Sequence, residues 1–275
     1  MIAAATFTEL LELEAVQRSF AAVVLASLGL PIAGVLIVGL DVITARFAVM
    51  HLALLGTTAG LFLGIDPVLS ALAVSCIATG ALTPLATRPG GLSGSMGLLM
   101  TMAIGSALLL LSITGVNATG AFEFLWGSVL ATRGSDLVLI GIVSGVVAGF
   151  TITNRKRLAL VLYDREIALT SGIAVGPLLF IMLVLVAASI ASAIRLTGAL
   201  LVDSLTLLPA LTARNLATSF RSMLGLSVAA GLLTNVGGLT LALATDMPPG
   251  PVLVLVAGSV TLASFLVPTV RKGST

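Results

Sequence analysis

Charged side chains are scarce in this chain. Asp, Glu, Lys and Arg make up only 9% of its 275 residues, whereas a soluble globular domain usually carries about 25%. So few charges cannot cover the surface of a water-soluble domain, because 58% of the residues are hydrophobic. The composition therefore predicts an integral membrane protein and argues against a soluble active site.

Cysteine and histidine are also nearly missing. Cys76 is the single cysteine and stands in an apolar segment, so no disulfide framework exists. His51 is the single histidine, so no Cys/His cluster offers a structural zinc site. The phosphate-binding pattern G-x-x-x-x-G-K-[ST] does not occur, which excludes ATP binding and hydrolysis through that motif.

Long apolar segments, separated by Gly, Pro and charge, fill most of the chain. Their lengths of roughly 17–25 residues suit helices that cross a bilayer, and the alternation typical of a membrane β-barrel is absent. We therefore expect an all-α, polytopic membrane helical bundle with eight or nine transmembrane helices, eight if one short segment is re-entrant. The segments are 19–40, 47–64, 67–86, 93–114, 136–153, 171–193, 197–211, 224–244 and 251–269.

Lys and Arg are divided unevenly between the two sides of this predicted bundle. Three of them, Arg18, Arg133 and Arg195, fall on one side. The positive-inside rule makes the other side cytoplasmic, with the N-terminus outside and the C-terminus inside. The ten residues on the cytoplasmic side are Arg46, Arg88, Arg155, Lys156, Arg157, Arg165, Arg214, Arg221, Arg271 and Lys272.

Two further patterns concern how the helices are placed. Residues 6–18 resemble an amphipathic helix at the outer interface, so 1–18 form an interfacial segment and 19–270 a single transmembrane domain. Trp126 suits the outer headgroup region. Gly141, Gly145 and Gly149 share one helical face and would allow close approach of another helix.

A few polar residues inside apolar segments are the candidates for function. Asp203 lies near the middle of segment 197–211, where a charge costs a few kcal/mol and usually faces a cavity or a partner. It either lines a cation path, pairs with an Asn or a backbone group to fix helix packing, or is protonated and has no function. His51 is either a ligand for zinc, manganese or iron or a packing residue. Asn235 either lines a path or holds helices together.

A short amphipathic helix is predicted after Pro209, on the cytoplasmic side. Its stretch "ALTARNLATSFRSM" carries Arg214 and Arg221 one heptad apart. Such a helix either lies on the lipid headgroups or docks into a partner protein. Its apolar residues follow the spacing i, i+4, i+7, i+8, at Leu216, Phe220, Met223 and Leu224.

Five stretches, in matching order, carry a resemblance to a known family. They are "MHLALLG", "EFLWGSVLATRGSDL", "LYDREIALTSGI", "GALLVDSLTLLPALTARNLATSF" and "DMPPGPVLVLVAG". Together they cover about residues 20–270. The chain resembles the permease subunit of ATP-binding-cassette importers for zinc, manganese and iron, a family related to the vitamin B12 and siderophore importers.

The resemblance implies a type II importer-like bundle in the bacterial cytoplasmic (inner) membrane. Two permease subunits, identical or different, would enclose the path at their dimer axis. Two cytoplasmic ATPase subunits would bind ATP and Mg²⁺, and an extracytoplasmic metal-binding protein would deliver the metal. This chain would catalyse no reaction, hold no cofactor of its own and bind no nucleic acid.

The resemblance also assigns residues. It places a coupling helix, which sits in a groove of the ATPase, at about Ala210–Met223. The contact residues are Ala213, Arg214, Leu216, Ala217, Phe220 and Arg221.

The metal-binding part of the family pattern departs from expectation here. The family usually has an Asp four residues before the His, but this chain has Phe47; Met50 and Leu55 replace its Ser and Pro. Either Asp203 supplies the carboxylate from another helix and forms the metal path with His51, or the subunit has lost the standard site. The second case would fit the degenerate half of a heterodimer or a different substrate.

Two rival functions follow from the same residues. An ion-coupled secondary transporter would use Asp203 as its proton or cation site and work without an ATPase. Such transporters often show an inverted repeat, which this sequence does not. A membrane enzyme acting on lipid would need acids, His or Ser gathered at one membrane face, and one His with one buried Asp is thin support for it.

Overall fold

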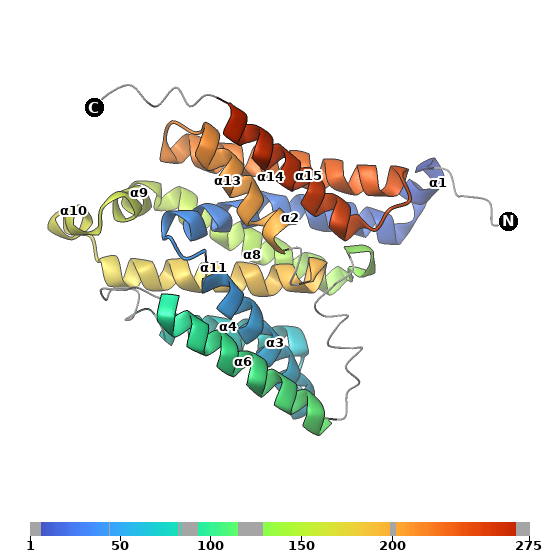
Figure 1. Cartoon of the computed structure of the whole chain (residues 1–275), viewed down its shortest axis with the longest axis horizontal. Coiled ribbons are helices and arrows are strands. Elements are labelled where there is room, and N and C mark those ends of the chain that lie inside the picture. Colours follow the sequence, from blue (N-terminus) through green and yellow to red (C-terminus); the bar gives the residue numbers. More distant parts are fainter. Residues whose placement is uncertain are drawn as a thin grey trace.

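The chain folds into a bundle of helices, several of which lie side by side along its long axis (Figure 1). The computed structural model describes residues 7–43, 45–81, 83, 93–114, 129–198 and 202–267, and within these ranges it contains no strand. The all-α prediction is therefore confirmed for the described part of the chain. Four residues with a predicted position, Trp126, Arg88, Arg271 and Lys272, lie outside the described residues.

The helices alternate with short connections along the chain. Their bounds are α1 Phe7–Glu12, α2 Glu14–Gly39, α3 Ala45–Leu63, α4 Pro67–Ala81, α6 Ser93–Thr114, the 3₁₀ turn η1 Val129–Ala131, α8 Gly134–Thr153, α9 Arg155–Tyr163, α10 Arg165–Thr170, α11 Val175–Thr197, α12 Val202–Leu205, α13 Leu207–Leu216, α14 Phe220–Ala244 and α15 Pro249–Leu266.

Six of these helices are long and apolar enough to cross a membrane. They are α2, α3, α8, α11, α14 and α15, while α4 and the stretch Gly97–Ile113 within α6 are apolar but shorter. Eight of the nine predicted segments thus coincide with one helix each. The count of eight or nine transmembrane helices stays a prediction.

The segment predicted at 197–211 does not form one continuous helix. Its described part is divided at Thr206 into the single turn α12 and the longer α13. The Thr206 hydroxyl donates to the Val202 carbonyl over 2.8 Å, which closes the turn. Pro209 has no backbone N–H, so it cannot donate a hydrogen bond to the Leu205 carbonyl. A continuous helix through this junction would need that hydrogen bond. Asp203 therefore lies in a four-residue helix and not in the middle of a long span.

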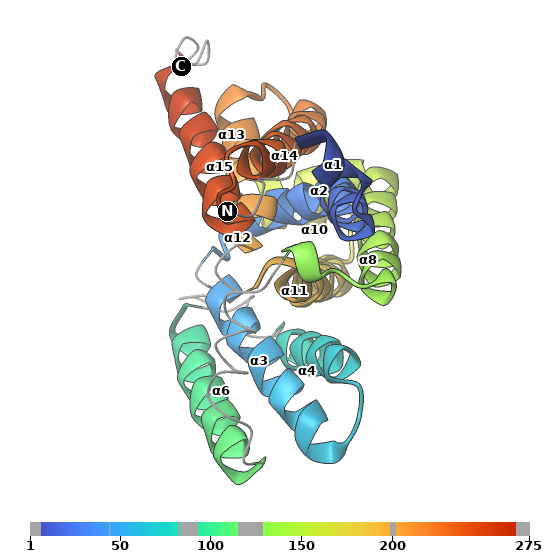
Figure 2. The ribbon, with the colours of Figure 1, turned by 90° about the vertical axis from the view of Figure 1, so that its right-hand side faces the viewer.

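The bundle has two groups of helices with α11 between them (Figure 2). In one group, α3 packs against both α4 and α6; in the other, α2 packs against α8, α13 and α14. Helix α11 contacts α4 and α3 on one side and α2 and α8 on the other. Its residues Met182 and Ile190 are fully buried, as is Leu36 of α2. The main apolar core therefore surrounds α11 and α2.

The two ends of the bundle differ in charge. Helices α9 and α10 lie at one end, whereas α1 and the turn between α14 and α15 lie at the other (Figure 1). Basic residues gather at the α9 end, in α9 and α10 and at the junction of α13 with α14. The described ones are Arg155, Lys156, Arg157, Arg165, Arg214 and Arg221.

Two sequence predictions about helix placement need correction. Residues 6–18 do not form one helix, because Leu13 is extended, with φ −69° and ψ 126°, and residues 14–18 belong to α2. Gly145 and Gly149 face open space and do not bring helices together. The close approach of α8 to α2 instead uses Gly29, where a Cβ would lie 2.3 Å from the Cα of Ser144.

Candidate functional site

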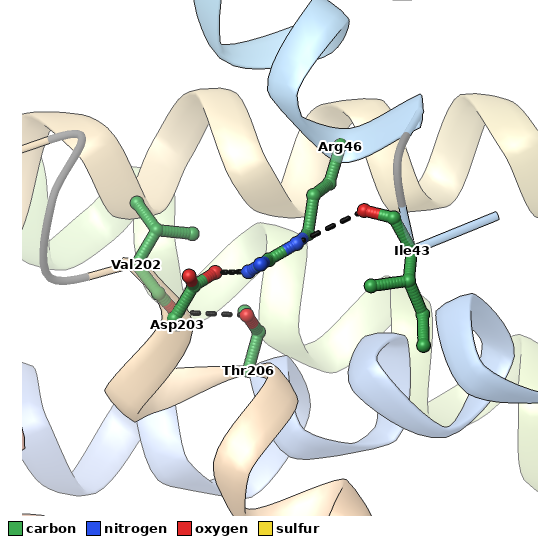
Figure 3. A network of polar contacts seen from close by, with 5 residues as sticks. All are labelled: Ile43, Arg46, Val202, Asp203 and Thr206. Carbon is green, nitrogen blue, oxygen red and sulfur yellow. Dashed lines mark hydrogen bonds and ion pairs between the residues drawn. The ribbon is translucent and has the colours of Figure 1, made fainter. Parts of the chain in front are cut away.

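Asp203 forms an ion pair with Arg46, which joins α12 to the first turn of α3 (Figure 3). The Arg46 side chain is 9% exposed and that of Asp203 29% exposed. The prediction that Arg46 lies in a loop is therefore wrong, because the residue belongs to α3 and its side chain is buried, while its side of the membrane stays a prediction. The packing interpretation expected an Asn or a backbone group beside Asp203, and the structure gives it a guanidinium instead.

Arg46 is also fixed by contacts with its own surroundings on the chain. Its Nε–H donates to the Ile43 carbonyl over 3.0 Å. Its guanidinium lies over the Phe47 ring, 4.4 Å from the ring centroid, at a distance typical of a cation–π contact. Both contacts are local to the start of α3 and add to the ion pair in fixing the guanidinium.

Phe47 occupies the position where the family usually has an acid. Its ring is 41% exposed and supports Arg46. The carboxylate of Asp203 reaches the same turn of α3 through Arg46. The acid has thus not simply moved from α3 to α12, because a guanidinium accompanies it and neutralises its charge.

His51 is oriented by its own helix. Its Nδ1 lies 2.6 Å from the Phe47 carbonyl oxygen, and a carbonyl only accepts, so Nδ1 carries the proton. In the neutral ring, Nε2 then keeps its lone pair and is able to bind a metal ion. The imidazole is half-buried.

His51 and the ion pair lie on different faces of α3. Five residues separate Arg46 from His51, which at about 100° per residue places them about 140° apart around the helix. In the described part of the chain, no three or more His, Cys, Asp and Glu side chains come together in a way that could hold a metal ion. The metal role of His51 and Asp203 therefore stays a prediction.

Asn235 contacts a neighbouring helix. It is fully buried, and its Nδ2 donates to the Ser27 hydroxyl over 3.1 Å. Ser27 in turn donates to the Gly231 carbonyl over 3.4 Å. These bonds join α14 to α2, as the packing interpretation of Asn235 requires.

The predicted coupling helix is two helices with a bend between them. Helix α13 ends at Leu216, and α14 begins at Phe220 after Ser219, whose hydroxyl accepts from the backbone N–H of Ser222 over 3.2 Å. The prediction of one continuous helix is therefore wrong, and its coupling role stays a prediction. Of the six assigned residues, the exposed ones are Arg214, Leu216 and Arg221, the half-buried one is Phe220, and the buried ones are Ala213 and Ala217.

Side-chain hydrogen bonds that the sequence did not predict tie α13 to α15. The hydroxyls of Thr212 and Thr261 lie 3.0 Å apart, and Thr261 also donates to the Leu208 carbonyl over 3.1 Å. Asn215 donates to the Ser264 hydroxyl over 2.8 Å. The only sequence signal is that hydroxyl and amide groups stand at helical spacing in otherwise apolar segments. These bonds favour movement of α13 and α15 as one body.

Residues 12–268 match the family model described as the ABC 3 transport family. The chain belongs to the ABC 3 transport family. This match spans the helices from α2 to α15 and includes both partners of the ion pair.

Two curated proteins similar to this ABC 3 family chain are named as membrane proteins of metal transport systems. The high-affinity zinc uptake system membrane protein ZnuB of Haemophilus influenzae is 28% identical over 206 residues, which cover 74% of this chain and 79% of that protein. The manganese transport system membrane protein MntC of Halalkalibacterium halodurans is 27% identical over 270 residues, covering 94% of this chain and 89% of that protein.

The fold has a solved counterpart. A chain of PsaBC from Streptococcus pneumoniae, solved in complex with Fab, superposes with a TM-score of 0.83 at 23% sequence identity. The superposition covers 97% of this ABC 3 family chain and 96% of that chain. At this identity, the likeness establishes the fold and leaves the site residues to be argued from this chain itself.

Proposed function

We propose that this chain is the membrane-spanning permease subunit of an ABC importer that moves a divalent transition metal ion into the cytoplasm. The observation that carries the proposal is the family match over residues 12–268 of the 275. The relatives named for zinc and manganese transport favour zinc, manganese or iron as the cargo. The chain catalyses no reaction and holds no cofactor, and ATP and Mg²⁺ bind to a separate ATPase subunit.

The experiment that tests this function is uptake into proteoliposomes that contain the permease with or without its ATPase. Zinc, manganese and iron are each offered with the extracytoplasmic binding protein, and ATP is supplied on the cytoplasmic side. We expect uptake of at least one metal, and only when both ATPase and ATP are present. Uptake without the ATPase would instead establish the ion-coupled secondary transporter, which the family match does not support.

The assembly in this proposal contains two permease subunits, identical or different, and two ATPases in the bacterial cytoplasmic membrane. The basic end of the bundle, with α9, α10 and the α13–α14 junction, faces the cytoplasm in agreement with the positive-inside rule. The N-terminus then lies outside and the C-terminus inside.

Cysteine labelling tests this orientation. In a Cys76→Ser background, an impermeant thiol reagent should label a cysteine at Asn154 only from the cytoplasm and one at Pro249 only from outside. Labelling of position 154 from outside would reverse the whole topology.

The segment Ala210–Met223 is proposed to dock into the ATPase. Arg214 and Leu216, at the end of α13, and Arg221, at the start of α14, present exposed side chains at the basic end of the bundle. Leu216 is 40% exposed, so a charge placed there does not disturb the core.

Leu216→Asp should therefore reduce capture of the ATPase and its stimulation while the permease stays folded. Met247→Asp is the matched control, because Met247 is an exposed apolar residue in the turn at the opposite end. Equal ATPase capture by both variants would refute the docking assignment.

The metal path is proposed to include His51 and Asp203, each doubled by the second subunit. The support is chemical: Nε2 of His51 is able to bind a metal ion, and Asp203 is a partly exposed carboxylate inside the membrane bundle. Asp203→Asn keeps the shape and removes the charge, so metal uptake should fall strongly at equal amounts of folded protein. If uptake persisted in the double variant Asp203→Asn/His51→Ala, both residues would be structural.

A further inference from the structure

The Arg46–Asp203 pair connects two parts of the molecule that otherwise share little packing. Helix α3 packs against α4, α6 and α11, whereas α12 packs against α11, α13, α14, α15 and α2. In the described chain, α3 and α12 do not form a broad contact with each other. The ion pair is therefore a direct, charged link between two helices that otherwise pack on a shared neighbour, α11.

The two partners of the link are held differently. Arg46 donates to the Ile43 carbonyl and lies over the Phe47 ring, two contacts that are local to the start of α3 and do not involve Asp203. Asp203 stands on the single helical turn α12, which meets α13 at Thr206. The carboxylate is thus the partner that a movement of α13 would displace, and the guanidinium is held by its own segment.

The moving partner is joined to the proposed ATPase-docking end. Helix α13 follows α12 after one residue and runs to Leu216, beside the exposed Arg214. The Thr212–Thr261 and Asn215–Ser264 hydrogen bonds make α13 and α15 one body. A shift of α13 at the basic end would therefore reach Asp203 through a single turn of helix.

We propose that Arg46 and Asp203 form a latch that is closed in this state and opens once in each transport cycle, with Arg46 as the positioning residue that holds α12 against α3. The proposal rests on the proposed function and deepens it, because it assigns a gating step to a pair of this chain's own residues. Separation leaves the carboxylate, whose side chain is 29% exposed in this chain, without its cation. Recombination restores the closed state, since an unpaired charge in the bundle is unfavourable.

The first test compares metal transported per ATP hydrolysed in proteoliposomes that contain the complete complex. Arg46→Gln, which leaves the carboxylate of the proposed metal path in place, should lower this ratio about tenfold, within the range typical of coupling between two sites, because ATP hydrolysis no longer starts from a closed latch. Arg46→Lys keeps a cation at this position and should retain much of the ratio. Ser27→Ala removes an interior hydrogen bond elsewhere and should leave the ratio unchanged.

A purely structural ion pair gives a different pattern. The single variants would then lower the amount of folded complex but not the ratio per folded complex, and the latch proposal would be wrong. If wild-type complex takes up none of the three metals, the proposed function fails. If it takes up metal and the ratio is the same in all variants, only the latch fails.

A second test remains decisive if the single variants do not fold. Arg46→Cys/Asp203→Cys, in a Cys76→Ser background, removes both charges together and leaves neither partner unpaired. A reducible bis-methanethiosulfonate reagent, whose spacer replaces the length of the two original side chains that a direct disulfide could not span, joins the thiols and holds α12 against α3. Uptake by the cross-linked protein should stop, and reductant should return it to the level of the untreated double variant. Equal uptake by the cross-linked and reduced protein would show that the two positions never need to separate.

Discussion

Two polar contacts inside the bundle differ in every respect that matters for movement. Asn235 and Ser27 join α14 to α2 by a neutral, fully buried hydrogen bond, and these two helices pack closely along the bundle. Arg46 and Asp203 join α3 to α12 by a charged contact with a partly exposed carboxylate, and these two helices hardly pack. The hydrogen bond adds to an interface that apolar packing already holds together. The ion pair is instead the main direct contact between α3 and α12.

The difference has a physical reason. A buried ion pair carries a large desolvation cost, so it contributes little to stability over an apolar contact of the same shape. A neutral hydrogen bond inside a membrane protein contributes only about 0.6 kcal/mol on average. The interface between α2 and α14 is suited to remain closed, and the link between α3 and α12 is suited to open, because little direct packing joins these two helices.

Breaking the charged link on one side should have the largest effect on stability. Arg46→Met leaves Asp203 without its cation, and we expect the free energy of unfolding to fall by about 3 kcal/mol, the lower end of the range for buried pairs because the carboxylate is 29% exposed. Thermal unfolding of the purified permease in detergent measures this.

The matched control removes both charges. Arg46→Met/Asp203→Leu leaves no unpaired group and should recover most of the lost stability, because replacing a buried pair by apolar residues is often neutral. If the double variant were as unstable as the single one, the loss would come from packing around Arg46 and not from its charge.

Crowding the junction of α12 with α13 should have the next largest effect. Gly34 of α2 contacts this junction so closely that a Cβ would lie 2.0 Å from the Thr206 carbonyl oxygen. Gly34→Ala forces backbone to move and should cost about 2 kcal/mol, as overpacking usually does.

Gly145→Ala is the control for this substitution, because Gly145 is also inside a helix but has open space around it. It should leave stability unchanged or raise it slightly, since Ala favours helix more than Gly does. Equal losses in the two variants would mean that α2 does not fix the position of the junction.

The sequence predicted the long helices well because a run of apolar residues of spanning length is a local property. It failed at the segment containing Asp203, where the break depends on Pro209 and on the close approach of Gly34 to Thr206. Pro209 in the sequence indicates that a helix is interrupted nearby. Nothing in the sequence indicates that the interruption falls at Thr206.

The candidate site was predicted only in part, for a related reason. A packing partner was one of three alternatives for Asp203, but an Asn or a backbone group was expected and Arg46 was assigned to a loop, because counting charges along the chain says nothing of contacts between distant segments. The contact of His51 with Phe47 is local, one helical turn apart. The spacing of Gly145 and Gly149 predicts that they share one face of a helix. It does not predict whether that face contacts another helix, because this depends on how the helices pack.

The smallest expected effect concerns the neutral hydrogen bond between Asn235 and Ser27, and it is compared directly with the Arg46–Asp203 ion pair. Ser27→Ala and Asn235→Ala each remove one partner of the bond between α2 and α14. A double-mutant cycle between them should give a coupling energy of about 0.6 kcal/mol, since the unfolded chain in detergent finds other polar partners. The same cycle between Arg46 and Asp203 should give a value several times larger, because each single change there leaves a charge unpaired. If the two coupling energies were equal, the ion pair would contribute no more than the neutral hydrogen bond. The energetic distinction between the α2–α14 contact, which stays closed, and the α3–α12 contact, which opens, would then be lost.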